Sequence, residues 1–409
     1  MIRHQVYFDT LGSLREDSAS WRAVFAGLSV MRLVDAYTDN SASVDPANWA
    51  QLHSVRSAVE DVSVGDPIRG VLSSVLEETI ARGTIDEIVC RSLLAYGRAL
   101  DYEASWSLAT DVFQTVAKIA RPEKNAKLAV EANIAVGGSA RRNGDWETSA
   151  RAYSQAAYIA DTMGDRQGVL TVQVGIANTY MAKGNWPHAQ SILDDVISQA
   201  ADLQLEEVQG VALHSGSALA ARRGDHAESV RLAHAALGVT KNPAARDNVL
   251  ADLAAAFANL GMRDASRDAN LLLAATAQTK LVRWQATINL MELAAGDGME
   301  EAFDQYAAEL RREPMGTYLK SHFLLFLGEG LEKFGRYDAS VEVLSEAKDF
   351  AEQNQIFEVS FKADNVLHAV QSRAQRHVAA PSSPDISHDV LAAAHDISEL
   401  RKAAVTAGN

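Results

Sequence analysis

Residues 142–153 read RNGDWETSARAY, residues 182–193 read AKGNWPHAQSIL, and residues 222–233 read RRGDHAESVRLA. Each stretch places a glycine, a turn-forming residue and a ring before small residues, and the three begin 40 residues apart (182 − 142 = 222 − 182 = 40). A glycine can adopt the left-handed conformation that ends one helix and directs the chain into the next. The spacing therefore predicts a repeated pair of helices joined by a tight turn.

The same turn position recurs on both sides of these stretches. Ala104 stands 40 residues before Gly144 (144 − 104 = 40). Gly261, Gly298 and Gly335 continue the series toward the C-terminus in steps of 37 residues (298 − 261 = 335 − 298 = 37). The period is thus maintained well beyond the three stretches that show it most clearly.

These intervals predict about seven repeats, with a period of about 37–40 residues, over positions 89–375. A pair of helices cannot bury its apolar face alone, so neighbouring pairs must stack. The chain is rich in alanine and has only 8 prolines, which favours helix throughout, and no run of alternating β-branched residues indicates a strand. We expect an all-α fold: an α-solenoid of stacked helix-turn-helix repeats with helical caps at both ends.

Small residues occupy one position before the turn and another after it, where neighbouring helices would touch. Examples are Gly97, Gly137 and Gly328 before the turn and Ser149 and Ser340 after it. Larger side chains four positions later, such as Phe113, Tyr153 and Leu344, would fill the remaining space. The pattern predicts close packing of the two helices within each repeat.

Composition narrows the classes of partner. The 409 residues are 47% hydrophobic and 22% charged, as expected of a folded chain, and 38 basic and 53 acidic residues give a net charge of −15. Such a surplus repels phosphate backbones and anionic lipids, so nucleic acid and membranes are poor candidates. Because we find neither a secretory signal nor a long apolar span, we expect a cytoplasmic protein. The lone cysteine, Cys90, is predicted to be a buried apolar residue.

Residues 1–88 lack the repeat and are predicted to form an N-terminal helical cap. Asp66 precedes Pro67, which places a capping carboxylate before a residue suited to a first helical turn. Thr84 and Glu87 have the spacing of a capping box that opens the first clear repeat. A DNA-binding helix-turn-helix in this region is disfavoured because it holds few basic residues. We expect helices near residues 19–38, 46–62, 67–82 and 85–102.

The chain is predicted to end with a linker over residues 376–388 and an amphipathic helix over residues 389–405. The linker contains AAPSSPD, a composition typical of coil. Val390, Ala394 and Ile397 recur at helical spacing and give the last helix one narrow apolar face. Four positions stay open for this helix: an end cap on the array, the groove of its own solenoid, a second subunit, or a partner.

The pattern resembles the tetratricopeptide repeat (TPR) family, most fully in VGGSARRNGDWETSARAYSQAA (136–157) and GIANTYMAKGNWPHAQSILDDV (175–196). The period exceeds the family's usual length of about 34 residues. Longer units are similar to those of bacterial signalling and regulatory proteins. The resemblance implies a right-handed superhelix in which the first helix of each repeat lines a concave groove that binds extended peptides or partner helices.

Carrying the groove-facing positions of the family onto this sequence gives nine candidate residues. They are Arg98, Tyr102, Arg141, Arg142, Asn178, Met181, Lys183, His214 and Arg222. Asn178 matches the family position where an asparagine often holds a peptide backbone, since an amide both donates and accepts. The basic members end successive first helices. There they either complement the helix dipole and stay solvated, or bind an acidic segment or carboxylate.

Motifs for catalysis or cofactor binding are not evident. We find no glycine-rich phosphate loop, no Cys-x-x-Cys and no His-Glu-x-x-His, so we expect no catalytic, cofactor or metal site. The sequence favours a non-catalytic scaffold or adaptor that binds a protein or peptide. If the basic candidates contact this partner, the partner is acidic. Self-association into homo-oligomers stays open. The alternatives are a ligand- or peptide-sensing regulator that acts through a separate effector, and an enzyme with an unrecognised site.

Overall fold

The computed structural model describes residues 3–16, 18–39, 46–120, 122–372 and 386–407. These residues form two compact bodies, each described below by itself. Body 1 comprises Met1–Gly175, Pro314–Lys320 and Glu352–Ile356, and body 2 comprises Ile176–Glu313, Ser321–Ala351 and Phe357–Asn409.

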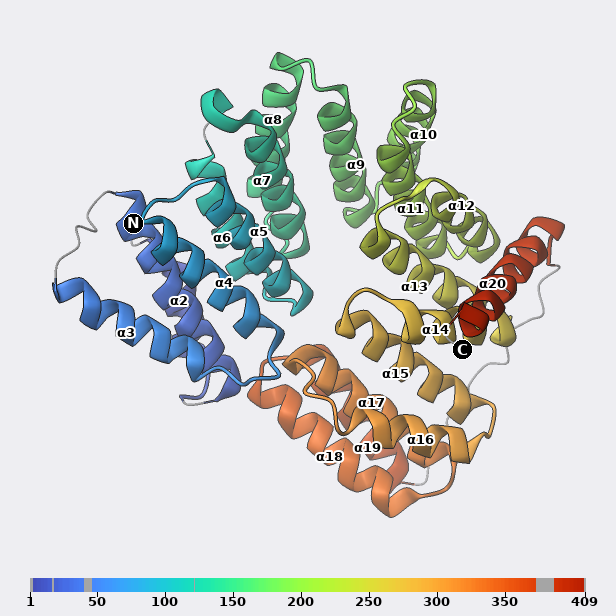
Figure 1. The fold of residues 1–409 in the computed structure, drawn as a ribbon. Helices are drawn as coiled ribbons and strands as arrows, with labels where there is room; N and C mark the ends of the chain where they lie inside the picture. The colour runs from blue at the N-terminus through green and yellow to red at the C-terminus, as the bar shows by residue number, and fades with distance from the viewer. Residues whose placement is uncertain (1–2, 17, 40–45, 121, 373–385, 408–409) are drawn as a thin grey trace. The chain divides into compact units, whose positions relative to one another are not determined.

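Body 1 contains the first helices of the chain (Figure 1). They are α1 (Gln5–Ser13), α2 (Ala19–Thr38), α3 (Pro46–Glu60), α4 (Pro67–Arg82), α5 (Glu87–Tyr102), α6 (Trp106–Ile119), α7 (Pro122–Arg142) and α8 (Trp146–Thr162). The start of α9 (Arg166–Ala182) also belongs to this body. Helices α2, α3, α4 and α5 lie close to the four ranges that the sequence predicts, and α1 is an additional helix that it does not.

Most of the later helices belong to body 2, which also holds the end of α9. They are α10 (Trp186–Asp202), α11 (Glu206–Arg222), α12 (His226–Val239), α13 (Pro243–Asn259), α14 (Arg263–Thr276), α15 (Lys280–Gly296), α16 (Glu300–Leu310), α17 (Thr317–Lys333), α18 (Tyr337–Gln353), α19 (Phe357–Gln371) and α20 (His388–Ala407). The start of α17 and the end of α18 belong to body 1. The described ranges contain no strand, and successive helices pack against each other, which confirms the all-α solenoid. None of these helices has the length and apolarity needed to cross a bilayer.

Each predicted repeat consists of a first helix and a second helix, such as α5 and α6, α7 and α8, α11 and α12, or α13 and α14. The turns between them have the predicted left-handed backbone, with φ of 76° at Gly144 and 78° at Gly224. Ala104 takes the same conformation, with φ of 55°, although it carries a Cβ. The turn residues therefore occupy equivalent positions, and they give a common frame for comparing repeats.

The small residues lie where the sequence predicts close packing. A Cβ on Gly97 of α5 would collide with the ring of Phe113 on α6. The hydroxyl of Ser149 donates to the carbonyl of Gly137 at 2.8 Å, and that of Ser340 donates to Gly328 at the same distance. Each contact joins the two helices of one repeat, so the backbones approach closely without leaving a buried hydroxyl unpaired.

The helix starts in the N-terminal region are partly as predicted. Asp66 caps α4 as expected, and its carboxylate accepts the backbone N–H of Ile68 at 2.9 Å. The capping box of Thr84 and Glu87 is wrong, because α5 begins at Glu87 and Asp86 caps it. The Asp86 carboxylate accepts two backbone N–H groups of the first turn, at 2.9 and 3.1 Å, which leaves no capping role for Thr84.

The last helix, α20, packs within body 2 against α12 and α14, the second helices of the fourth and fifth repeats. Val390, Ala393 and Ile397 are fully buried there, in one apolar core with residues of α12, α13 and α14. Helix α20 thus packs on second helices of its own array, away from the end of the repeat series, which is neither the end cap nor the first-helix groove that the sequence left open. Most of the predicted linker, residues 376–388, lies outside the described residues.

Cys90 is buried in α5, with 1% of its surface exposed. Burial raises the pKa of its thiol to about 12, since the thiolate would lose its hydration. The prediction of a buried apolar residue is confirmed, and the thiol stays protonated at neutral pH.

Candidate functional site

Two of the three candidate arginines of body 1, Arg98 and Arg142, are paired with carboxylates of the neighbouring repeat. Arg98 Nη2 on α5 lies 2.5 Å from Glu131 Oε1 on α7. Arg142 Nη1 at the end of α7 lies 2.5 Å from Asp101 Oδ2 on α5. Both guanidinium groups remain about half exposed, so these pairs hold the side chains in place while leaving them accessible to a partner.

Body 2 repeats this arrangement with other residue types. Asn178 Nδ2 on α9 donates to Ser215 Oγ on α11 at 3.3 Å. His214 Nε2 on α11 lies 2.7 Å from Asp252 Oδ2 on α13. The partners are 37 and 38 residues apart, which is one repeat. We call the four contacts the polar ladder, namely Arg98–Glu131, Asp101–Arg142, Asn178–Ser215 and His214–Asp252.

Three further candidates have exposed side chains. Tyr102, the last residue of α5, is 57% exposed although it is a large aromatic residue. Lys183 and Arg222 are exposed beyond or at the ends of α9 and α11. Within the described part of the chain, Arg222 makes no ion pair or side-chain hydrogen bond. Tyr102 and Arg222 are therefore the candidates best placed to contact another molecule.

Two candidates are largely buried and offer a partner little surface. Met181 is 8% exposed. Burial lowers the pKa of Arg141, the nearby Tyr153 hydroxyl opposes this effect, and the charge of Arg142 adds to it. The Arg141 Nε is buried without a hydrogen-bond partner. Nothing in the sequence indicates this difference, because Arg141 and Arg142 are adjacent and chemically identical.

The nine candidates are divided between the two bodies. Those from Arg98 to Arg142 belong to body 1, and those from Asn178 to Arg222 belong to body 2. In body 1 the structure places Arg98 and Arg142 on the same pair of first helices, through their contacts with Glu131 and Asp101. In body 2 it joins each of Asn178 and His214 to the following first helix rather than to each other.

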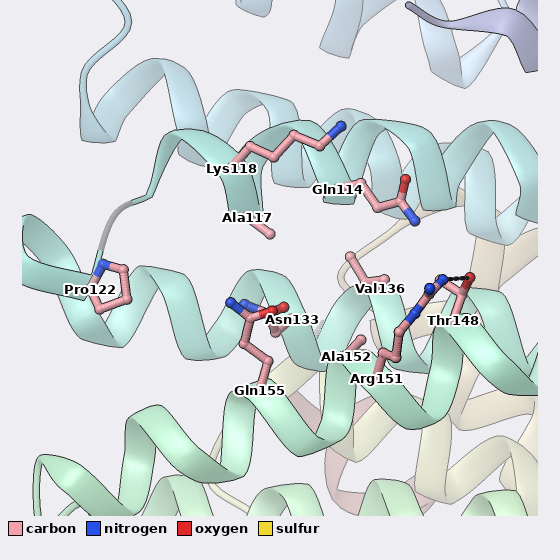
Figure 2. Close-up of a pocket in the computed structure, with 10 residues that line it drawn as sticks. All are labelled: Gln114, Ala117, Lys118, Pro122, Asn133, Val136, Thr148, Arg151, Ala152 and Gln155. Carbon is pink, nitrogen blue, oxygen red and sulfur yellow. Dashed lines mark hydrogen bonds between the residues drawn. The ribbon is translucent and has the colours of Figure 1, made fainter. Parts of the chain in front are cut away.

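A pocket on the second helices was not anticipated from the sequence. It has a volume of about 430 Å³ and lies between α6 and α8 over α7, all in body 1 (Figure 2). Figure 2 shows Gln114 and Lys118 of α6 on one side and Arg151 and Gln155 of α8 on the other, with none of its ten labelled residues acidic. The buried Asn133 of α7 lines its floor. The groove-facing positions carried over from the TPR family lie on first helices, so they do not include these residues.

A second cavity, of about 310 Å³, adjoins His4. The His4 imidazole is 4% exposed and lies between two carboxylates of body 1. Its Nδ1 is 2.5 Å from Asp111 Oδ2 on α6, and its Nε2 is 3.2 Å from Asp35 Oδ2 on α2. No sequence signal indicated this contact, because His4 precedes the first helix and Asp111 is 107 residues away.

Within the described ranges no group of three or more His, Cys, Asp or Glu side chains is arranged to hold a metal ion. The polar groups at the surface are instead donors and acceptors spread along helices. Such groups suit the recognition of a peptide or a helix, whose polar atoms are also spread along a chain.

Comparisons with known proteins add little to this geometry. No protein-family model and no curated protein sequence matches the chain. The chain is similar to a solved Rap protein complexed with Competence and Sporulation Factor, at 14% identity over 87% of this chain and 99% of that chain, with a TM-score of 0.33. It is also similar to a circular tandem repeat protein with a novel repeat topology and enhanced subunit contact surfaces, at 15% identity over 97% of this chain and 100% of that chain, with a TM-score of 0.17. At these scores neither likeness carries an argument about function, and the helical-repeat architecture rests on the helices themselves.

Proposed function

We propose that this protein is a non-catalytic scaffold or adaptor that binds a protein or peptide segment on the surface of its first helices, with a TPR-like array as the frame. The observation that carries the proposal is the polar ladder. Its members are polar groups that are at least partly exposed, and their orientation is fixed by contacts between successive first helices. Groups held in this way lose little conformational entropy when a ligand binds.

The ladder also defines what kind of ligand the surface suits. Arg98 and Arg142 already have carboxylate partners, which reduces the attraction for a uniformly acidic ligand. Asn178 contributes an amide, which recognises a peptide backbone by donating and accepting. Arg222 retains a free guanidinium for a carboxylate. The best match is a peptide whose backbone contacts the amide of Asn178 and which carries an acidic residue where it reaches Arg222.

Exposed tyrosines on the two kinds of helix allow a matched test. Tyr102 ends a first helix and is 57% exposed, whereas Tyr158 lies on the second helix α8 and is 73% exposed. Each is replaced separately by the photoreactive residue benzoylphenylalanine, which is similar in shape. After irradiation in native lysate, we expect a protein or peptide adduct at position 102 that an excess of unlabelled protein suppresses.

Position 158 is the control, because it is at least as exposed and belongs to the same body. Labelling of the same partner at both positions would show that contact follows exposure alone. The absence of a competable adduct at position 102 would contradict binding on the first helices.

A further inference from the structure

The pocket between α6 and α8 has a counterpart in body 2. Aligning the turn at Ala104 with Gly224, and the turn at Gly144 with Gly261, places α6 on α12 and α8 on α14 (224 − 104 = 120; 261 − 144 = 117). Helix α7 then corresponds to α13. The counterpart of the pocket is therefore the surface formed by α12, α13 and α14, and α20 occupies it.

In body 2 this surface binds α20 through an apolar face with a polar contact on either side. Asp396 Oδ2 of α20 is 3.1 Å from His234 Nε2 of α12. Arg401 Nε of α20 is 2.8 Å from Asp268 Oδ1 of α14. Body 2 thus provides an example of an amphipathic helix bound across two second helices.

The charge at this surface is reversed in body 1. Arg151 of α8 stands at the position of Asp268 (151 + 117 = 268). A helix bound across α6 and α8 in the manner of α20 would therefore need an acidic residue where α20 has Arg401. Lys118 of α6, which also lines the pocket, adds a second cation with no ion pair among the described residues.

Two further positions of the pocket are polar, and one of them is apolar in body 2. Gln114 replaces His234 (114 + 120 = 234), and Asn133 replaces the buried Leu250 (133 + 117 = 250). Asn133 is 6% exposed, and its Nδ2 donates to a backbone carbonyl of α7 at 2.7 Å. Its Oδ1 is left as an acceptor in the floor of the pocket. Where body 2 has an apolar side chain, body 1 thus presents an acceptor that needs a hydrogen-bond donor from the ligand.

The cations of the pocket are available to a partner. Arg151 Nη1 lies 3.4 Å from Glu147 Oε1, but these side chains are 70% and 82% exposed. An ion pair so exposed contributes little, and a better placed carboxylate can replace it. In a chain of net charge −15, a pocket with two cations and no carboxylate among its labelled residues is a local reversal of sign.

We propose that the α6–α8 pocket is the docking site for an acidic amphipathic helix of a partner protein, bound as α20 is bound to α12 and α14. The partner helix carries a carboxylate for Arg151 and Lys118 and an amide or hydroxyl donor for Asn133. Charge excludes a simpler occupant, the α20 of a second copy, because its Arg401 would face Arg151. The site is on second helices, so it stands or falls separately from the first-helix surface proposed above.

The test uses a labelled synthetic peptide of residues 386–407, which contain α20, with the substitutions Ile397→Gln and Arg401→Glu. The glutamine supplies the amide donor for Asn133. The glutamate supplies the carboxylate for Arg151 and disfavours the α20 site itself, where it would face Asp268. We expect saturable binding to the full chain by fluorescence anisotropy. Replacing Lys118 and Arg151 together by glutamate should weaken it by about tenfold or more, since two attractive contacts become repulsive.

Arg311→Glu with Arg312→Glu is the matched control, because it reverses two exposed cations at the end of α16, outside both proposed binding surfaces, with the same change in net charge, and it should leave binding unchanged. A reciprocal variant guards against misfolding. Arg151→Asp restores the charge found at position 268, so it should bind the unmodified α20 peptide more tightly than the wild-type chain does. Absence of saturable binding, equal loss in the control, or no gain in the reciprocal pair overturns the proposal.

Discussion

The imidazole of His4 connects three elements of body 1 through one side chain. His4 is the residue directly before α1, and its imidazole contacts Asp35 of α2 and Asp111 of α6. Its backbone is left-handed, with φ of 57°, which costs energy in a residue with a Cβ. Such a conformation persists only where surrounding contacts stabilise it, and here the two carboxylates do so.

Protonation determines the strength of this contact. Burial lowers the pKa of His4, but hydrogen bonding and charge from Asp111, with the charge of Asp35, outweigh it, and the pKa lies above its ordinary value of 6.5. A raised pKa in the folded state means that the stabilisation is complete below the unfolded pKa and is lost as pH rises through the folded one. Two other groups lie beside His4. Arg3 forms an ion pair with Asp39 at 2.7 Å, and the ring of Tyr7 lies edge-on to the His4 imidazole.

We therefore predict that His4→Ala lowers the free energy of unfolding by about 2 kcal/mol at about pH 5.5, and by less at about pH 9. Denaturant unfolding at the two pH values measures the difference. His53→Ala, which removes an exposed histidine from α3, is the control and should show no such dependence. A His4→Ala effect that grows with pH would contradict the assignment of an imidazolium between two carboxylates.

At the scale of the helix pair, the contact between Gly97 and Phe113 tests the close packing within a repeat. We predict that Gly97→Ala destabilises the protein by about 1–3 kcal/mol, because the added methyl overlaps the ring of the buried Phe113. Gly70→Ala in α4 is the matched control, since nothing lies within 4 Å of its new methyl. There alanine's helix propensity should raise stability by up to about 1 kcal/mol. Thermal unfolding of both variants decides, and equal effects would show that backbone propensity rather than packing dominates.

The elements differ in how far the sequence predicts them. The turn at Gly144 and the contact of Gly97 with Phe113 follow from spacing, because both depend on neighbours within one repeat. The ladder pair of Arg98 and Glu131 does not follow, because it depends on the register of two stacked repeats and on which of several acids lies within reach. Spacing also cannot separate the buried Arg141 from the exposed Arg142, since a small rotation of the helix about its axis decides which of the two adjacent side chains is buried.

At the scale of the molecule, the array assembles mainly from contacts between neighbouring helices, and α20 departs from this pattern. It follows α19 in sequence but packs on α12 and α14, helices that precede it by more than a hundred residues. Its apolar face was visible in the sequence. The surface that accepts that face was not, because α12 and α14 carry apolar residues that could equally have packed between repeats. A long-range contact of this kind adds stability to selected repeats without extending the array.

We predict that Ile397→Asp releases α20 and weakens the helices beneath it. The Ile397 side chain is fully buried, so a carboxylate there would lose its hydration without gaining a partner. The apolar burial of isoleucine is lost as well, and together the two effects destabilise the packing of α20 by about 3 kcal/mol or more. Because repeats contact mainly their neighbours, the effect should be local. Hydrogen exchange should show loss of protection in α12, α13 and α14 and unchanged protection in α5 and α6. Leu391→Asp, at a position of the same helix that is 52% exposed, should leave the exchange pattern as in the wild type. Equal loss of protection along the whole chain would mean that the solenoid unfolds as one cooperative body, and that α20 stabilises all of it rather than the repeats it touches.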